Sequence, residues 1–363
     1  MKRLLAMFLA LIMVLALGAC APKDDATEVP SNAADPETGE TPEAQGSEAA
    51  EFDPADVTLT FASLLLNHPV LRIVELGFVE ACEELGYQYQ IVGTETADLN
   101  DMNAAAEAAA AAGSEAVLIW AQDSSCLSTV KALKNDYGCV VGVPHTVWEQ
   151  TDIPELDFNL ACVSTTYGAQ CADFMAERLE GKTGSIAITQ ASYNITEDAA
   201  AAAFKERIEE LQAEGKMEGI TVLDPVLEGG SDLTESTNAN VSVIQANPDL
   251  IAAFGLTGNS PVTWTNAAKK CGYEVGELLI VGMDYTAENL ECLEEGWVTG
   301  IVGQPLYTEA YEAVYKMDAI LRGEAVDYWT ELEAPIIYTG GEGVHDPDTY
   351  AGILDRVSEK FGE

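Results

Sequence analysis

The sequence predicts an α/β fold made of two lobes, each a parallel sheet flanked by helices. The first observation is that short apolar segments alternate with amphipathic segments along almost the whole chain after residue 56. Strands of about four to eight residues alternating with helices of about ten or more are typical of repeated β-α-β units. The second observation is length, because residues 56–363 exceed the usual size of a single hydrophobic core.

The expected elements follow from these patterns in chain order. Strands are predicted at 57–65, 87–92, 115–120, 138–143, 158–163, 184–189, 219–226, 250–255, 278–282 and 298–302. Helices are predicted at 69–85, 100–112, 125–136, 166–180, 195–214, 232–246, 260–271, 286–295 and 305–322. Pro69 suits the first position of the first helix, and we expect Gly77 to let that helix pack closely on the sheet.

The N-terminal segment has the layout of a secretory signal. Lys2 and Arg3 precede an apolar stretch from 4 to 17, too short to span a bilayer comfortably. The Leu-Gly-Ala-Cys that ends at Cys20 resembles the lipobox of bacterial lipoproteins, in which this cysteine is lipidated. We therefore expect a signal peptide over 1–20 and an anchor on the outer face of the cell membrane.

Residues 21–55 are expected to form a disordered acidic tether. This stretch is rich in Ala, Pro, Glu, Asp, Ser, Thr and Gly, and it cannot bury enough apolar surface to offset the entropy of ordering. A flexible chain of this length has a root-mean-square reach of roughly 30 Å. The folded part would then stay near the membrane and reorient above it.

Charge and cysteine content exclude several classes of partner. The chain has 17 Lys and Arg against 61 Asp and Glu, a formal net charge of −44, which argues against nucleic acid and anionic lipid head groups. Seven cysteines follow Cys20, an odd number without a CxxC pair, so most are expected to be small buried apolar residues. A single disulfide bond is still compatible with the sequence, and the candidate pairs are Cys126–Cys139 and Cys271–Cys292.

Polar side chains gather directly after the predicted strands. In open parallel sheets, ligands bind beyond the carboxyl ends of the strands. Here those positions carry amides, carboxylates, imidazoles and indoles, which suit a neutral, hydroxyl-rich small molecule. The residues are Asn67-His68, Trp120 to Asp123, His145 to Trp148, Gln190 to Asn194, Thr257 to Asn259, Asp284 and Gln304.

Catalytic and metal chemistry is poorly supported. The three histidines form no HxH or HxxxH pair, and GxSxG, GxxxxGK[ST] and GxGxxG are all missing from the sequence. We therefore expect no enzyme activity, no metal site and no cofactor.

The motifs taken together resemble the ribose-binding-like, sugar-binding subgroup of type I periplasmic-type solute-binding lipoproteins, which serve ABC importers. The matching segments keep the subgroup's order and spacing over residues 57 to about 338. They are Leu66-Asn67-x-Pro69 with Gly77, "AVLIWAQD" at 116–123, "NPDLIAAFGLTGN" at 247–259, "LLIVGMDYTAE" at 278–288 and "VTGIVGQPLYTEAYEAV" at 298–314.

This resemblance implies two Rossmann-like lobes joined by a hinge of three crossovers, near 145–155, 303–305 and 329–335. The N-terminal lobe would comprise 56–148 and 305–331, and the C-terminal lobe 149–304 and 332–363. The protein would be a monomer that captures a sugar or sugar-like molecule by hinge closure and delivers it to an ABC transporter permease.

The resemblance also implies roles for individual residues. Asp123 and Asp284 match positions that accept hydrogen bonds from sugar hydroxyls, and Gln304 matches the hinge glutamine. Asp123 fits a helix N-cap equally, as does Asn67. The further candidates for ligand contact are Asn67, His68, Trp120, His145, Trp148, Tyr193 and Asn259.

The sequence departs from the subgroup's pattern at three places, so the identity of the ligand is not fixed by the resemblance. The usual aromatic pair after Pro69 is replaced by Val70 and Leu71, the usual arginine before the helix containing Phe204 is missing, and Thr257-Gly258 stand at the usual Asn-Asp. The alternatives are a receptor for a non-sugar solute (a furanosyl signal, a nucleoside or an amino-acid derivative) and a sensory co-receptor for a membrane kinase.

Overall fold

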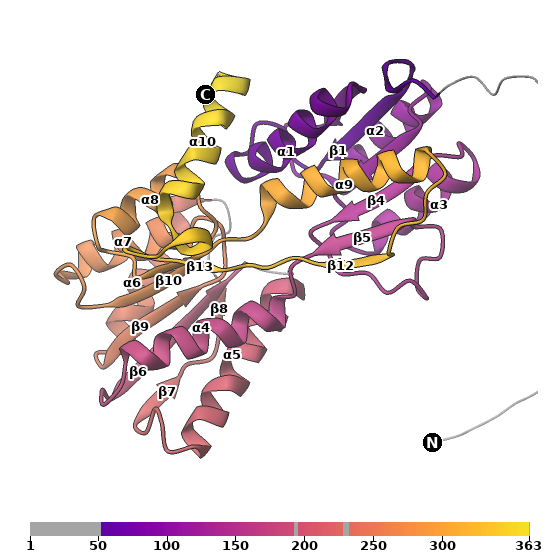
Figure 1. Ribbon diagram of the computed structural model, residues 1–363. Coiled ribbons are helices and arrows are strands. Elements are labelled where there is room, and N and C mark those ends of the chain that lie inside the picture. The colour runs from indigo at the N-terminus through magenta and orange to yellow at the C-terminus, as the bar shows by residue number, and fades with distance from the viewer. Residues whose placement is uncertain (1–51, 192–194, 228–231, 363) are drawn as a thin grey trace, which may run out of the picture. The chain divides into compact units, whose positions relative to one another are not determined.

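The computed structural model describes residues 52–191, 195–227 and 232–362, and they form two sheets with helices packed on both (Figure 1). Within this part of the chain, no helix is long and apolar enough to cross a bilayer. Cys20 and the expected tether up to residue 51 lie outside the described residues, as does Tyr193.

The first sheet has the strand order β12-β5-β4-β3-β1-β2, and all its pairings are parallel. Helix α1 packs on α9 and α2 on α3, and these helices contact the sheet. The strands are β1 (Thr58–Ser63), β2 (Gln88–Gly93), β3 (Ala116–Ile119), β4 (Val140–Pro144), β5 (Phe158–Ala161) and β12 (Trp329–Glu331). The helices are α1 (Pro69–Leu85), α2 (Leu99–Ala111), α3 (Leu127–Asn135) and α9 (Leu306–Leu321).

The second sheet has the order β13-β11-β10-β9-β6-β7, with β8 paired to β6, and only β13 runs antiparallel among its described strands. Its strands are β6 (Gly184–Gln190), β7 (Ile220–Val222), β8 (Val226–Leu227), β9 (Leu250–Gly255), β10 (Leu279–Met283), β11 (Gly300–Val302) and β13 (Ile336–Ile337). Its helices are α4 (Ser164–Arg178), α5 (Ile195–Ala213), α6 (Leu233–Ala246), α7 (Ser260–Cys271), α8 (Ala287–Glu294) and α10 (Pro347–Phe361).

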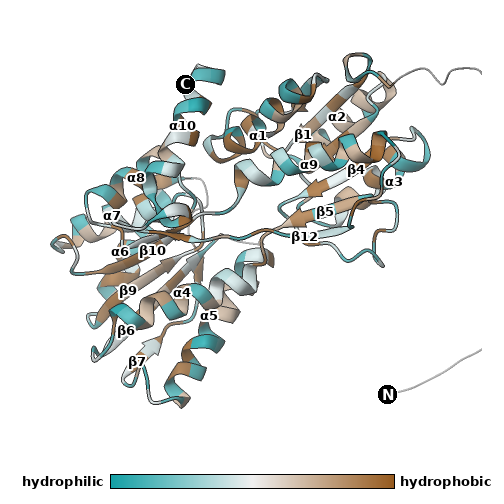
Figure 2. Ribbon diagram, viewed as in Figure 1, coloured by the Kyte–Doolittle hydropathy of each residue, from teal (hydrophilic) through white to brown (hydrophobic). Residues whose placement is uncertain are grey.

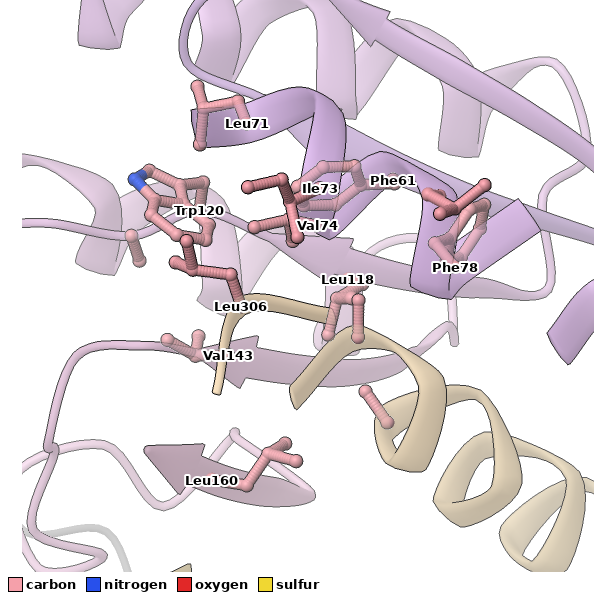
Figure 3. Close-up of a cluster of buried hydrophobic side chains, with 14 of the residues drawn as sticks. Phe61, Leu71, Ile73, Val74, Phe78, Leu118, Trp120, Val143, Leu160 and Leu306 are labelled. Atoms are coloured by element: carbon pink, nitrogen blue, oxygen red, sulfur yellow. The ribbon is translucent and has the colours of Figure 1, made fainter. Parts of the chain in front are cut away.

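The predicted α/β class with two parallel-type sheets is confirmed. In Figure 2 the strands of both sheets are mainly hydrophobic, and the helices carry hydrophilic faces. The core of the first sheet is drawn in Figure 3, where Phe61 and Leu118 from the strands meet Ile73, Phe78 and Leu306 from the helices.

Gly77 has a different partner from the one expected. A Cβ atom at this position would lie 2.1 Å from the backbone carbonyl oxygen of Tyr307 on α9. The glycine therefore lets two helices approach each other, and the contact with the sheet is made by other residues of α1.

The first crossover between the sheets also differs from the expected position at 145–155. Strand β5 pairs with β4 and β12 in the first sheet, so the chain crosses after Ala161, at residues 162–163. The expected strand over 158–163 had been assigned to the C-terminal lobe, and hydrophobic periodicity does not reveal which sheet a strand joins. The other crossovers run through 303–305 and 332–335.

The three crossovers lie side by side and are hydrogen-bonded to one another. The Gly303 amide donates to the Pro335 carbonyl at 2.7 Å, and the Leu332 amide donates to the Ala161 carbonyl at 3.0 Å. Gln304 Nε2 contacts Cys162 Sγ at 3.9 Å. The two sheets are therefore connected by three backbone segments that lie side by side and contact one another.

Helix α10, which the sequence patterns did not identify, contacts elements on both sides of this connection. Near its start, the Tyr350 ring lies 4.6 Å from the ring of Tyr285, which follows β10 of the second sheet. Near its end, Arg356 and Lys360 pair with Glu80 and Glu83 of α1 at 3.1 and 2.5 Å. Its amphipathic face thus links α1 to the second sheet.

All seven cysteines of the described chain are free thiols, and every one except Cys271 is buried. The two candidate bridges are therefore not formed. Burial raises the pKa of the Cys162 thiol to about 12, which keeps it protonated and unreactive at neutral pH.

Candidate functional site

A cavity of about 370 Å³ lies where the carboxyl ends of strands from both sheets meet. This volume falls within the usual range for small-molecule sites, about 300–1,000 Å³. From the first-sheet side it is lined by Gln122, Asp123, His145 and Thr146. The other lining residues are Tyr167, Ala191, Ile195, Thr196, Glu197, Leu256, Gly258, Met283, Asp284 and Gln304.

His145 and Asp284 lie in the same kind of backbone position, one residue after strands β4 and β10. Both have left-handed backbone conformations, with φ of 71° and 64°. Such φ values are uncommon for residues other than glycine, although histidine, asparagine and aspartate tolerate them best. Strained residues of this kind cluster at functional sites, where they aim a side chain that an ordinary strand end would not.

Asp284 is the most deeply buried carboxylate of the cavity. It is 6% exposed, and its Oδ1 has no hydrogen-bond partner among the described residues. Burial raises the pKa of Asp284 to about 7. The charge of His145 partly offsets this rise, and the Glu309 carboxylate adds to it. The side chain is therefore poised to accept a hydrogen bond from a ligand.

Asn289, fully buried on α8, holds the loops on both sides of Asp284. Its Nδ2 donates to the carbonyls of Gly258 at 2.7 Å and of Asp284 at 2.8 Å, and contacts the Met283 carbonyl at 3.1 Å. These bonds supply a side-chain donor to backbone carbonyls on both loops. Asn289 therefore fixes the two walls of the cavity next to Asp284 without lining it.

His145 is held between an aromatic ring and a buried acid. Trp120 stacks on its imidazole with ring centroids 4.5 Å apart, and Nδ1 lies 3.2 Å from Oε1 of Glu309 on α9. Burial disfavours the imidazolium, but the Glu309 carboxylate and, less strongly, Asp284 outweigh it and raise the pKa of His145. Burial raises the pKa of Glu309 as well, which His145 partly offsets.

Four of the predicted site residues come together in the cavity: Asp123, His145, Asp284 and Gln304. Asp123 is exposed there and also caps a helical turn, since its Oδ1 accepts a hydrogen bond from the Ser125 amide at 2.7 Å. Both of its predicted roles are compatible with this position.

Five other predicted residues do not line the cavity. Trp120 is 3% exposed and packs in the core beside Phe61 and Leu306 (Figure 3), so it supports His145 rather than offering a face to a ligand. Trp148 donates its indole N–H to the Ala121 carbonyl at 3.2 Å. Asn259 accepts from the Thr257 hydroxyl at 2.8 Å.

The Asn67-His68 turn is likewise directed elsewhere. Asn67 is exposed, has a φ of 65°, and its side-chain oxygen accepts a hydrogen bond from Arg72. The residue before Pro69 in the helix-capping position is His68, and its side chain makes no capping bond. Burial lowers the pKa of His68, which is therefore neutral at neutral pH.

Glu309 and Glu197 are the acids that sequence reasoning missed. Glu309 falls on the apolar face of α9 with Leu306, Ala310 and Ala313, and a carboxylate on a buried face is a recognisable signal. Glu197 lies in the first turn of α5, and its Oε2 accepts from the Ala191 amide at 2.5 Å. Nothing in the local pattern distinguishes it from the many surface acids.

The described part of the chain contains no group of three or more His, Cys, Asp or Glu side chains placed to hold a metal ion. The cavity instead offers carboxylate, amide, imidazole and hydroxyl groups, together with apolar side chains such as Leu256 and Met283. This arrangement can bind a small molecule with several hydrogen-bond donors.

Several solved structures of similar fold are described as sugar-binding or carbohydrate-transporter proteins. A glucose-galactose binding protein from Geobacillus stearothermophilus is 18% identical with a TM-score of 0.68, covering 78% of this chain and 97% of its own. A sugar-binding protein of a sugar ABC transporter from Bacillus halodurans is 19% identical with a TM-score of 0.69, covering 81% and 99%. A carbohydrate transporter solute-binding protein from Agrobacterium radiobacter, in complex with D-arabinose, is 19% identical with a TM-score of 0.70, covering 82% and 98%.

A search of curated protein sequences gave no match. The family model described as a periplasmic binding protein domain, however, matches residues 61–325. That span takes in most of both sheets and every residue that lines the cavity. The chain therefore belongs to the periplasmic binding protein family and has its type I fold.

Proposed function

We propose that this protein is the extracytoplasmic substrate-binding component of an ABC importer and that it captures a sugar in the cavity around Asp284. The observation that carries the proposal is a cavity lined from both sheets by hydrogen-bonding groups, with a buried carboxylate oxygen that has no partner in the described chain. Sugar hydroxyls supply the donors that such acceptors require. The family and the sugar-binding proteins of similar fold support the same substrate class.

Capture would proceed by hinge closure about the three crossovers. Because these segments are bundled together and Gln304 lies in one of them, a rotation there would change the separation of His145 and Asp284 across the cavity. A ligand that contacts both walls stabilises the closed state by its differential affinity for it. No bond is made or broken in this mechanism, so the protein would act as a binding protein and not as an enzyme.

Delivery to the permease would depend on anchoring by a lipid on Cys20, with residues 21–55 as the tether. We propose that the folded part acts as a monomer on the outer face of the membrane. Mass spectrometry of the mature N-terminus would detect a diacylglyceryl-modified cysteine, whereas an unmodified cysteine, or cleavage elsewhere, would contradict the anchor.

Native mass spectrometry of the purified protein, followed by thermal-shift screening against pentoses, hexoses and polyols, tests the substrate class. We expect a bound or added sugar to raise the melting temperature, since a ligand that binds only the folded state stabilises it by mass action. A response confined to nucleosides or amino acids, with none to any sugar, would contradict the proposal.

A further inference from the structure

The lining of the cavity carries more acidic than basic side chains. Three carboxylates line it, those of Asp123, Glu197 and Asp284, while His145 is the one described lining residue that can carry a positive charge. No lysine or arginine is found among the described residues that line it. A phosphate or carboxylate on a ligand would therefore meet repulsion here from several sides.

The one imidazole of the described lining is shared between two acids, because His145 interacts with Asp284 and more strongly with Glu309. Its Nδ1 is 3.2 Å from Oε1 of Glu309, whose side chain is fully buried. His145 in the cavity lining and Glu309 behind it thus form an ion pair. Asp284 lines the cavity, and its Oδ1 has no hydrogen-bond partner among the described residues.

The backbone around Asp284 leaves room for a donor to approach. A Cβ atom at Gly258 would lie 2.7 Å from Asp284 Oδ2 and 3.4 Å from Val70 Cγ2, so the glycine keeps open the space beside this oxygen. Asn289 donates to the carbonyls of both loops, and none of its bonds goes to the Asp284 carboxylate. The oxygen left without a partner is therefore Oδ1 of a carboxylate that lines the cavity, where a ligand can reach it.

From this geometry we infer that the preferred ligand is a sugar that carries a protonated amino group, which Asp284 binds, and that sugar acids and sugar phosphates are excluded. This inference rests on the proposed function and narrows its substrate class. An ammonium group supplies both the missing charge and several N–H donors to one carboxylate, and charge-assisted hydrogen bonds are about twice as strong as neutral ones. A neutral sugar supplies only the donors.

Matched pairs of sugars test the inference with the full chain. Galactosamine and glucosamine would be compared with galactose and glucose by isothermal titration calorimetry at pH 6.5 and pH 7.5, because the amines are more fully protonated at the lower pH and Asp284 is more fully ionised at the higher. N-acetylgalactosamine, glucuronate and glucose 6-phosphate serve as neutral and anionic comparisons. We expect at least one amino sugar to bind at least tenfold more tightly than its parent, equivalent to about 1.4 kcal/mol, and no binding of the anions.

The variant Asp284→Asn should remove this preference, since it keeps the size of the side chain and deletes its charge. Asp136→Asn is the matched control, because Asp136 is an exposed aspartate at the end of α3 and does not line the cavity. It should keep most of the preference. Equal losses in the two variants would overturn the assignment to Asp284.

The outcomes separate the inference from the proposed function. If neutral sugars bind as tightly as their amino counterparts, or if an anionic sugar binds, the inference is wrong and the proposed function stands. If no sugar of any charge binds, the proposed function itself fails.

Discussion

Replacing Asp284 by asparagine should stabilise the ligand-free protein while weakening its binding of ligand. The ionised side chain is buried in a cavity that provides Oδ1 with no donor, and its pKa is raised to about 7 from the ordinary carboxyl value of 3.8. At about 1.36 kcal/mol per unit of pH, holding this group ionised destabilises the fold by roughly 4 kcal/mol above pH 7. The buried amide of asparagine needs donors and acceptors of its own, so a net gain of roughly 2 kcal/mol is expected.

The sign of the pH dependence follows from the raised pKa. Between pH 4 and pH 7 the folded state holds a proton on Asp284 that the unfolded state has lost, so the stability of the wild-type protein falls as pH rises through this window. The advantage of Asp284→Asn should therefore grow from pH 5 to pH 8. Left-handed backbone at position 284 is no obstacle, since asparagine tolerates it well.

Urea denaturation at pH 5, 6.5 and 8 measures this difference, with Asp136→Asn, an exposed aspartate at the end of α3, as the control. The control should change stability by less than about 0.5 kcal/mol at every pH. A variant that is less stable than wild type at pH 8, or a difference that does not vary with pH, would refute the argument that Asp284 is a destabilised, ligand-directed carboxylate.

Three further predictions concern the surroundings of this carboxylate. Gly258→Ala places a methyl group 2.7 Å from Asp284 Oδ2, so ligand affinity measured by calorimetry should fall more than tenfold, and unchanged affinity would show that no ligand occupies this space. Asn289→Ala removes the donor to two loop carbonyls and should cost roughly 1–3 kcal/mol in urea denaturation, whereas a neutral result would mean that these loops are held by other contacts. Replacing both Arg356 and Lys360 by alanine removes two partly exposed ion pairs to α1 and should cost less than about 2 kcal/mol in total; a larger loss would mean that α10 holds the two sheets together more strongly than surface ion pairs allow.

The element boundaries were largely predictable because the period of the hydrophobic pattern is strong. Helices α1 and α7 begin and end at the predicted residues, with proline in the first turn and a left-handed glycine after the last. Helix α10 was missed although its signals are present: Asp346 caps it, Pro347 follows, and its amphipathic pattern is clear. The short strands β12 and β13 carry too few residues to show a period.

Long-range placement was less accessible to sequence reasoning. Which sheet receives β5 depends on pairing between distant segments, and this determines where the first crossover lies. Similarly, the rule that ligands bind beyond strand ends correctly brought His145, Asp284 and Gln304 together, but it could not tell that Trp120 turns into the core. Side-chain direction after a strand depends on local φ and ψ, which no periodicity encodes.

The central claim is that the cavity around Asp284 captures a sugar. Its most direct measurement is isothermal titration calorimetry of the full chain with the sugar that gives the largest thermal shift, in wild type and in Gly258→Ala, with the melting temperature of both proteins as a check on folding. We expect saturable one-to-one binding to wild type and a more than tenfold loss of affinity in the variant, with little change in its melting temperature. Equal affinity in the two proteins would place the sugar elsewhere and contradict the claim.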